Sequence, residues 1–579
     1  MITIIRLFLG LLLVILSGLP FSFILLPSKL KQNLLFLITI SYAIGVGIVS
    51  LVMILISLLE INFALQTILL FLTIIILISF SFLIYRKVQT KAVKNNHAVL
   101  DKNLDRINKN INENSKSSTI PFKRQKLLKI IEIVLLVLIL FQVLASIFIT
   151  VIFPVRFWDA ITCWSFKAKA FFLDKTIYDF YSKHSYKFSH PSYPILLPLL
   201  QTYSYFSMGT LNENLMKLIF PLFYISLLIV NYGFLRIKYS EINLKVNNNS
   251  AKIKKDNRIL RKNYPKITSL FFTFILSTIP IIFDHSYIEY TNLAFAFYLY
   301  LSVMFMILWI RFKDNRLKTN GLIILSAIFA SQLSLLRSEG ILFSAFIFIL
   351  FAFYLFKSKD HIFKSNKYEN KSLLLKEDNK INWNHKDEFD LVIRDETLPL
   401  RGGNKIGKNL YKYKFFEKYY KKFVIFILVL IVMLIFTAPW LLLKSKLNLG
   451  ILSIDWNGFK NSITFYKENF INSISGLFNE FLFSKYDSTT GFFKSSYSIY
   501  WIIIILVFIL FYKEVFRKEN IVILSTITFS LIIYLIGSSL IPDFLTSMER
   551  YLLHIFPISF YLTTIILGEK IQSFIKALI

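Results

Sequence analysis

The sequence predicts an all-α, polytopic transmembrane protein, and three observations carry that prediction. Of the 579 residues, 55% are hydrophobic and 17% aromatic, and the mean hydropathy is +0.60, which excludes an ordinary soluble protein. Many apolar stretches reach the length of about 20 residues that a spanning helix needs. The Lys and Arg residues behind the formal net charge of +32 gather in the connections between these stretches. That placement is typical of charge-oriented membrane proteins rather than of nucleic-acid-binding proteins.

The apolar stretches set the predicted order of the helices. One short segment, 194–209, would force the loop 236–266 and its ten basic residues outside if it crossed the membrane. We therefore predict that it is a half-span or interfacial helix that returns to the side it left. The full spans, about 13 in number, are predicted at 4–27, 33–58, 63–85, 126–152, 215–235, 267–284, 291–311, 320–336, 341–356, 423–443, 497–513, 521–541 and 553–570.

Loop charge also predicts the orientation. The connections 86–126, 236–266 and 357–422 are rich in Lys and Arg, which places them in the cytoplasm. The N-terminus is then outside the cell (plasma or inner) membrane and the C-terminus is cytoplasmic. The N-terminal apolar run is too long for a cleavable signal, and no small-residue cleavage site follows it.

Four parts are predicted along the chain. They are a three-helix membrane segment with a basic cytoplasmic loop (1–125), a catalytic membrane core with a first outer loop at 153–193 (126–356), a polar and mobile cytoplasmic loop (357–422), and C-terminal membrane helices with a small outer subdomain at 444–496 (423–579).

This topology places five short polar clusters on one predicted outer face, although they come from different helix ends. Ionisable residues at membrane depth are costly, so they are expected to line a cavity or a substrate path rather than to face lipid. The clusters are "RFWDAITCWSFKAK" (156–169), "KFSHPSYP" (187–194), "DHSYIEYTN" (284–292), "LRSEG" (336–340) and "TSMERYLLHIFP" (546–557).

The clusters contain the groups that a transfer reaction at this face would need. Asp159 and Glu289 are candidate catalytic carboxylates, because a carboxylate can take a proton from an attacking hydroxyl. Basic side chains suit an anionic leaving group such as a phosphate, and the planar guanidinium of Arg binds two oxygens at once. The candidate substrate- and phosphate-binding residues are Lys167, Arg337, Glu339, Arg550, His554, His190, Trp158, Trp164 and Tyr193, with Lys169 as the weaker lysine.

Each candidate also has a purely structural interpretation. Trp158 and Trp164 suit an interfacial aromatic belt, and the two lysines suit snorkelling to the headgroups. Arg337 and Glu339 can form a clasp on one turn. Arg550 and His554 share a helix face at i and i+4 and can cap a neighbouring helix.

Several soluble chemistries are missing from the sequence. It has no GxxxxGK[ST], no GxGxxG after a strand, no HExxH and no zinc-ligand spacing, so a nucleotide-binding soluble domain is not expected. The single cysteine, Cys163, excludes an intrachain disulfide and a cysteine metal cluster. We expect no cofactor. Two acids can hold a divalent cation, but the ligand set is thin for an obligatory metal.

The clusters also form an ordered motif set. In chain order the motifs are Trp158-Asp159-Ala160, Trp164, Lys167-Ala168-Lys169, His190-Pro191-Ser192-Tyr193-Pro194, Arg337-Ser338-Glu339-Gly340, and Ser547-Met548-Glu549-Arg550-Tyr551-Leu552-Leu553-His554 with Pro557. This order resembles the GT-C class of membrane glycosyltransferases. It most resembles the glycosyltransferase family 39-like proteins, relatives of the protein O-mannosyltransferases and of the enzymes that add aminoarabinose to lipid A. The resemblance covers about residues 126–570 and leaves out the first three helices.

The resemblance implies a polyprenyl-phosphate-sugar donor, and a glycan, lipid or protein acceptor at the outer face. It further implies an inverting displacement in cell-envelope glycan biosynthesis. Such enzymes carry a catalytic acid in the first outer loop, where Asp159 lies, and often a second acid at a later helix pair, where Glu289 is nearest. Three positions depart from the family pattern: Glu289 replaces Asp in a context without Pro, Ser192 replaces Asp, and Arg337 replaces Lys.

Two alternatives stay open. A polymerase or ligase of lipid-linked glycans would have a large outer loop rich in Arg, whereas the outer loops here carry mixed charge. A transporter or flippase would place polar or broken helices near the bilayer midplane, whereas segments such as "VIFILVLIVMLIFTA" are almost wholly apolar. If residues 158–172 form an interfacial helix, Asp159 and Lys167 lie about two turns apart and on roughly one face. Asp455 and Trp456 of the outer subdomain could contact an acceptor, or the subdomain could serve only as a cover.

Overall fold

The computed structural model describes most of the chain, in two compact units. Unit 1 comprises Met1–Ile347 and Val432–Ile579, and unit 2 comprises Phe348–Ile431. All the candidate site residues belong to unit 1. The described residues are 1–85, 122–248, 258–312, 316–357, 404–449, 474–476, 485–487, 492–494, 497, 499–540 and 548–578.

The described part of the chain is helical apart from one short antiparallel strand pair, β1 (Lys485–Asp487) with β2 (Phe492–Lys494). The long helices are α1 (Ile2–Leu25), α3 (Leu34–Leu58), a helix at Leu65–Tyr85, α5 (Phe122–Ile152), α10 (Ile219–Asn248), α11 (Arg258–Ser277), α13 (Asn292–Arg311), α14 (Arg316–Leu336), α15 (Gly340–Phe356), α17 (Asn404–Lys446), α21 (Ile521–Leu540) and α23 (Met548–Leu578).

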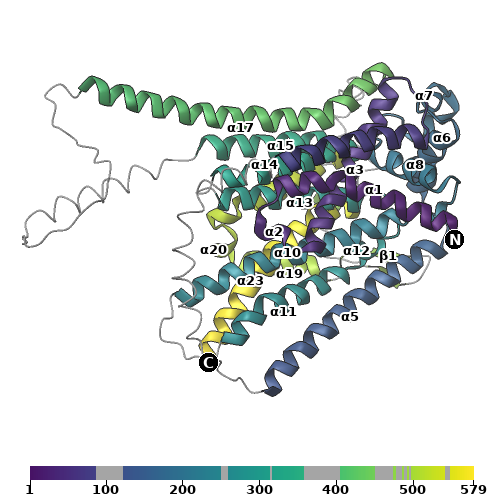
Figure 1. Ribbon diagram of the computed structural model, residues 1–579. Helices are drawn as coiled ribbons and strands as arrows, with labels where there is room; N and C mark the ends of the chain where they lie inside the picture. The colour runs from purple at the N-terminus through teal and green to yellow at the C-terminus, as the bar shows by residue number, and fades with distance from the viewer. Residues whose placement is uncertain are drawn as a thin grey trace, which may run out of the picture. The chain divides into compact units, whose positions relative to one another are not determined.

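Shorter helices connect and flank these long ones (Figure 1). They are α2 (Ser28–Lys31), the π-helix η1 (Ala160–Trp164), α6 (Ser165–Leu173), α7 (Tyr178–Ser182), the 3₁₀ turn η2 (His184–Ser189), α8 (Leu196–Met208), α9 (Glu213–Met216), α12 (Pro280–Asp284), α19 (Tyr500–Leu510), α20 (Tyr512–Val515) and the 3₁₀ turn η5 (Lys518–Asn520).

The prediction of a helical chain with several helices able to span a membrane is confirmed. Within the described ranges, nine helices are long and apolar enough to cross a membrane, and three further apolar helices are shorter. Every predicted span overlaps at least one helix, while the number that cross stays a prediction. The nine are Ile2–Leu25, Leu34–Leu58, Leu65–Tyr85, Lys126–Ile152, Glu213–Ile242, Asn292–Arg311, Tyr419–Lys446, Lys518–Gly537 and Met548–Gln572.

Several predicted boundaries are wrong because apolarity and helicity do not end together. The predicted span 267–284 is broken between Ser277 and Pro280, where Pro280 begins α12 and cannot donate a backbone hydrogen bond. The predicted loop 236–266 is partly helical, because α10 runs on to Asn248 and α11 begins at Arg258. Likewise, α17 begins at Asn404 inside the predicted polar loop, whereas residues 358–403 lie outside the described residues.

The predicted half-span is a real short helix, α8. It has 13 residues, about 20 Å of helix, which is too short to cross a bilayer core of about 30 Å. All its side chains are buried, so it is enclosed by protein rather than lying at an interface with one face toward lipid. Gly209 ends it in the left-handed conformation with φ 76°, which glycine adopts without a steric penalty.

The first three helices belong to unit 1 through close contacts. Glycines let α1 and α3 approach: a Cβ on Gly45 would lie 1.8 Å from the Val14 carbonyl oxygen, and one on Gly18 would lie 2.0 Å from that of Ser41. Small residues at such contacts are the usual means of helix association in membranes. The Tyr203 hydroxyl of α8 also donates to the Gly10 carbonyl at 2.9 Å.

The interior of unit 1 centres on α13, which is buried from Asn292 to Trp309. Its polar side chains find partners on neighbouring helices. The Tyr300 hydroxyl donates to Asn231 Oδ1 at 3.1 Å, and the Asn231 amide donates to the Thr273 hydroxyl at 3.2 Å. Mutual pairing of this kind satisfies these polar groups inside an apolar bundle.

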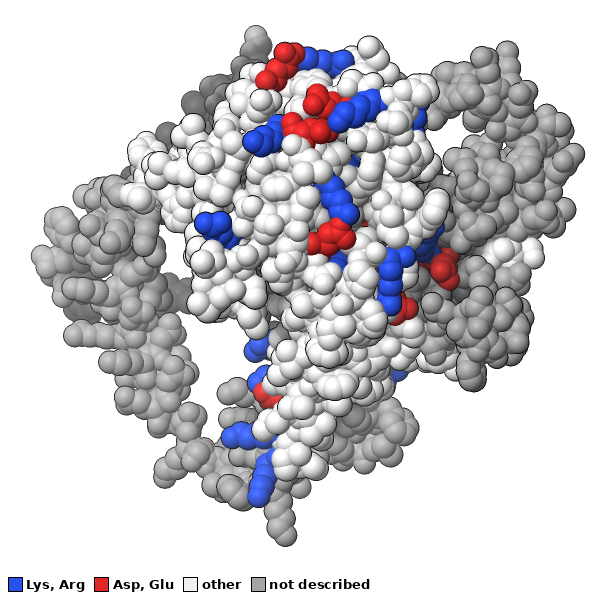
Figure 2. All heavy atoms as spheres, turned by 90° about the vertical axis from the view of Figure 1, so that its right-hand side faces the viewer, with Lys and Arg blue, Asp and Glu red and all other residues white. Residues whose placement is uncertain are grey.

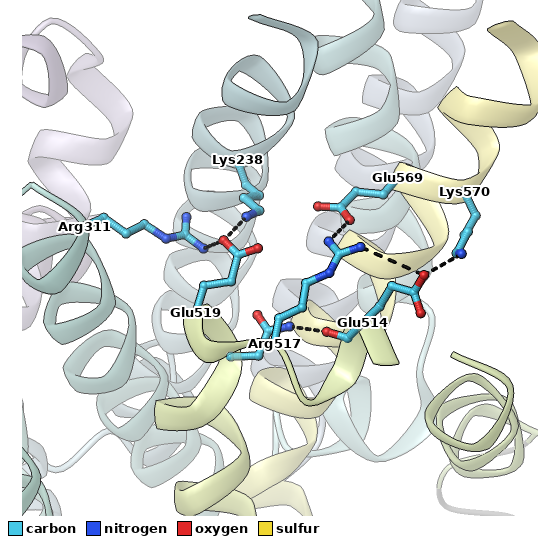
Figure 3. A network of polar contacts seen from close by, with 8 residues as sticks. Lys238, Arg311, Glu514, Arg517, Glu519, Glu569 and Lys570 are labelled. Carbon is cyan, nitrogen blue, oxygen red and sulfur yellow. Dashed lines mark hydrogen bonds and ion pairs between the residues drawn. The ribbon is translucent and has the colours of Figure 1, made fainter. Parts of the chain in front are cut away.

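Charged residues lie at the two ends of the unit 1 helices. At one end, Glu519 pairs with Lys238 at 2.9 Å and with Arg311 at 3.7 Å, while Arg517 pairs with Glu569 at 2.6 Å (Figure 3). All these residues come from the predicted cytoplasmic ends of their helices. The predicted outer clusters lie at the other end, with α6, α7 and α8 (Figure 1). This separation agrees with the predicted alternation of the helices, and which end faces the cytoplasm stays a prediction.

Unit 2 contains the predicted cytoplasmic tract. Its described part packs through aromatic rings, with Phe348 and Phe426 5.1 Å apart, and an apolar cavity of about 600 Å³ lies beside them. The predicted outer subdomain 444–496 lies almost wholly outside the described residues, and so do Asp455 and Trp456.

We predict that Gly45→Leu lowers the melting temperature of the detergent-solubilised protein. The new side chain must displace the Val14 carbonyl, and such overpacking costs about 1–3 kcal/mol. The control is Leu9→Val on α1, where Leu9 is 54% exposed. This change should shift the free energy of unfolding by less than about 0.5 kcal/mol. Thermal unfolding followed by tryptophan fluorescence makes the comparison. Equal melting temperatures for Gly45→Leu and wild type would contradict the close contact.

Candidate functional site

An acid and a base from distant parts of the chain meet at the predicted outer end. Arg550 Nη1, on the first turn of α23, lies 2.5 Å from Asp159 Oδ2, just before η1. The two residues are 391 positions apart in sequence. Asp159 is 40% exposed and Arg550 24%, so both remain within reach of a molecule arriving from outside.

The segment between α12 and α13 forms the floor beneath this pair. The guanidinium carbon of Arg550 lies 5.0 Å from the ring centroid of Tyr290, which suits a cation–π contact. The other side of the floor is Phe157, whose ring meets Tyr290 edge to face at 6.1 Å. Burial raises the pKa of the Tyr290 hydroxyl, and the Asp159 carboxylate raises it further.

A second ion pair lies next to the first. Arg337 Nε donates to Glu339 Oε1 at 2.5 Å, and both side chains are about 15% exposed. Asn292 joins the two pairs, because its Oδ1 accepts from Arg337 at 3.4 Å and its amide donates to the Arg550 carbonyl at 3.1 Å. The ring of Tyr551 lies under the Arg337 guanidinium at 4.8 Å. The predicted clasp between Arg337 and Glu339 is therefore present, and it is tied into the larger cluster.

The first outer loop contributes an aromatic wall held by Lys167. The Tyr193 ring stacks on Trp164 at 5.8 Å and on His190 at 4.8 Å. Lys167 is wholly buried and donates to the His190 carbonyl at 2.7 Å. Burial lowers the pKa of Lys167, and the neighbouring Cys163 thiol opposes that shift. Among its described contacts, the Lys167 ammonium thus serves the loop itself.

The aromatic wall adjoins the charged cluster. Burial raises the pKa of the Tyr193 hydroxyl, the Arg337 guanidinium opposes the rise, and the Glu339 and Asp159 carboxylates add to it. Figure 2 looks onto this end of unit 1, where acidic and basic side chains lie in adjacent groups on an otherwise uncharged surface.

The predicted single helix over 158–172 is wrong in one detail that matters. Residues Ala160–Trp164 form a π-helix before α6 begins at Ser165. A π-turn holds more residues than an α-turn, so it rotates the side chains beyond it relative to those before it. Asp159 therefore points to Arg550 while Lys167 points into the protein. Lys169, the weaker candidate, pairs with Glu213.

The second predicted catalytic acid is deeply buried. Glu289 is 1% exposed, and its Oε1 lies 3.7 Å from Lys217 Nζ. Two other candidate binding residues differ strongly from each other in exposure. His554 is fully buried, with its Nδ1 2.8 Å from the Tyr534 hydroxyl. Trp158, in contrast, is 77% exposed, as an interfacial aromatic residue would be.

Sequence reasoning missed the residues that connect the cluster. Four residues of the predicted polar clusters are not among the predicted site residues, namely Tyr290, Thr291, Asn292 and Tyr551. The available signal was "YTN" directly before a long apolar helix, where polar side chains at membrane depth need partners. Within the described ranges, no three His, Cys, Asp or Glu residues lie close enough to hold a metal ion.

No protein-family model, no curated protein and no solved structure matches the chain. The resemblance to the GT-C glycosyltransferases therefore rests on the short motifs and on where they lie.

We predict that Glu339→Gln destabilises the protein more than Glu213→Gln does. Arg337 loses the carboxylate that neutralises it in a largely enclosed place, which costs about 3 kcal/mol by analogy with buried pairs. Glu213 pairs with Lys169, which is 41% exposed, and such a surface pair is worth less than about 1 kcal/mol. Melting temperatures of the two variants, measured side by side, decide the matter. A larger loss for Glu213→Gln would contradict the central place of the Arg337 pair.

Proposed function

We propose that this chain is an integral membrane glycosyltransferase that moves a sugar from a polyprenyl-phosphate donor to a glycan, lipid or protein acceptor at the outer face of the membrane. The observation that carries the proposal is the meeting of Asp159 with Arg550 beside the Arg337–Glu339 pair. Glycosyl transfer from a lipid phosphate needs one base and a cationic site for the leaving phosphate, a few ångströms apart.

The proposed step is a single displacement. The acceptor oxygen attacks the anomeric carbon while the bond from that carbon to the phosphate oxygen breaks. The acceptor proton passes to the Asp159 carboxylate, and the electron pair leaves with the polyprenyl phosphate, so the anomeric configuration inverts. Arg550 and Arg337 stabilise the phosphate as its charge grows, since guanidinium groups bind two phosphate oxygens at once.

The Asp159–Arg550 pair suits a resting state of this step. Without substrate, each group neutralises the other in a place where an isolated charge is costly. An arriving donor phosphate competes for Arg550 and releases the Asp159 carboxylate to accept a proton. In the aromatic wall, Trp164 is buried behind Tyr193, and His190 is the exposed ring that could lie against a sugar.

The lipid part of the donor could lie along α5. An open apolar hollow of about 900 Å³ lies on this helix between Phe141 and Ile152. The chain passes directly from Ile152 into the connector that carries Asp159. A polyprenyl tail along α5 would therefore bring its phosphate toward the charged cluster.

The alternative functions are a transporter or flippase, and a polymerase or ligase, of lipid-linked glycans. Asn231, Tyr300 and Thr273 inside the described bundle are hydrogen-bonded to one another, which disfavours a transport path past these three side chains. The polymerase and ligase interpretation shares the outer charged face, and it differs from the proposed function chiefly in the acceptor.

We predict that Asp159→Asn abolishes release of polyprenyl phosphate. The purified protein is incubated in detergent with a panel of polyprenyl-phosphate sugars and membrane extract of its source organism, and free polyprenyl phosphate is measured by mass spectrometry. Loss of a general base lowers the rate by about 10²–10⁴-fold. Asp174→Asn, in an acid of the same loop that pairs with Lys183 at 3.1 Å, should keep the wild-type rate.

Other results would redirect the proposal. Release that survives Asp159→Asn would remove Asp159 as the base. Lipid binding without release from any donor, in the wild type, would favour the transporter.

A further inference from the structure

Residues 153–157 form a connector between α5 and the helical turn that carries Asp159. The consecutive residues Glu289 and Tyr290 act on its two ends, Glu289 through Lys217. At its start, Lys217 Nζ donates to the Phe153 carbonyl oxygen and also faces Glu289 Oε1 at 3.7 Å. At its end, Tyr290 packs against Phe157 and lies under Arg550. The connector is otherwise irregular from residue 153 to 157, so these contacts define where η1 begins.

The Lys217–Glu289 pair is too enclosed to meet a substrate. Their side chains are 1% and 2% exposed. Glu289 Oε2 is buried and has no hydrogen-bond partner among the described residues, so Lys217 is the cation that the carboxylate faces. A buried ammonium without a carboxylate is costly, and Lys217 would turn away from Phe153 to find water if Glu289 were neutral.

We propose that Glu289 is a positioning residue, which through Lys217 fixes the Phe153 carbonyl and so holds the connector that presents Asp159 to Arg550. We call the contacts from Glu289 through Lys217 to the Phe153 carbonyl the brace. Its role in catalysis rests on the proposed function, whereas its geometry does not. The proposal gives the two candidate acids different roles. Asp159 would contact the substrate, whereas Glu289 would only hold the connector that carries Asp159.

The brace has a built-in dependence on pH. Burial raises the pKa of Glu289 to about 7, although Lys217 opposes the shift and Glu213 adds to it. Tyr205 of α8 and Tyr290 of the same segment also lie within reach of this charge, and Arg156 of the connector acts on Lys217. The carboxylate, and with it the brace, predominates above about pH 7 and is lost as the pH falls through that value.

Global stability follows the opposite slope. The folded protein keeps the Glu289 proton up to about pH 7, whereas the unfolded chain releases it near about pH 4.3. The free energy of unfolding therefore declines as the pH rises between these values. A local measurement is needed to see the brace itself.

Cys163 provides that measurement, because it is the single cysteine of the chain. It lies on η1, four residues after Asp159, is 2% exposed, and its Sγ is 3.4 Å from the Ser189 carbonyl. If the brace holds the connector, its loss exposes this thiol. We predict that Glu289→Gln raises the rate of Cys163 alkylation by a maleimide about tenfold or more in the full-length protein, by local opening.

Two variants make the test specific. Lys217→Arg keeps the cation and should stay within about threefold of the wild-type alkylation rate, since local openings that cost little free energy change the rate little. Glu519→Gln breaks a second Lys–Glu pair with a buried lysine, in which Lys238 lies at 2.9 Å and is 4% exposed. It lies at the opposite end of unit 1 and should lower the melting temperature without raising the alkylation rate.

The pH series adds a signature that simple damage would not give. The thiolate fraction of Cys163 changes with pH in every variant alike, so the ratio of the Glu289→Gln rate to the wild-type rate cancels it. This ratio should be large at pH 8 and fall toward one at pH 6, because protonated Glu289 resembles the amide.

The outcomes separate the two proposals. A Glu289→Gln rate equal to wild type overturns the brace, and so does an equal rise in Glu519→Gln. Where wild type transfers sugar, Glu289→Gln should lower kcat and leave the donor KM within about threefold, as a displaced base does. Failure of wild type to transfer sugar would refute the proposed function and leave the alkylation result on the brace intact.

Discussion

The structure depends on one constraint: a charge among apolar helices must find its partner inside the protein. Unit 1 meets this constraint at both helix ends. At one end Glu519 serves Lys238 and Arg311 together. At the other end Asp159 with Arg550 and Arg337 with Glu339 are joined through Asn292. Pairing across different helices fixes how the helix ends meet, so the same contacts that remove the cost of burial also assemble the candidate site.

Sequence reasoning predicted the helices and their alternation because hydropathy and loop charge record these directly. It could not predict where a helix continues past its apolar part. α10 runs beyond the predicted end because Lys238 and Glu241 pair with Glu519 and Arg311, and such partners leave no mark in a local window. The short enclosed α8 was found for a different reason: crossing would have placed ten basic residues on the wrong side.

The residues of the candidate site were easier to predict from the sequence than the role of each residue. The motifs around Asp159, Arg337 and Arg550 contain residues that lie together in space. What the motifs could not predict is direction. The π-turn at Ala160–Trp164 directs Lys167 inward to the His190 carbonyl. Glu289 is buried, whereas Asp159 stays partly exposed at the surface. Direction depends on backbone register and packing, which short motifs do not specify.

The separation of Asp159 from Arg550 by 391 residues has a consequence for how the protein is made. Chain synthesis at about 5–20 residues per second leaves Asp159 without its arginine for roughly 20–80 s. During that time Asp159 lacks the guanidinium that pairs with it in the folded protein. The Asp159–Arg550 pair can form only when α23 joins the helices made before it, so a late-made helix completes the charged cluster of the candidate site.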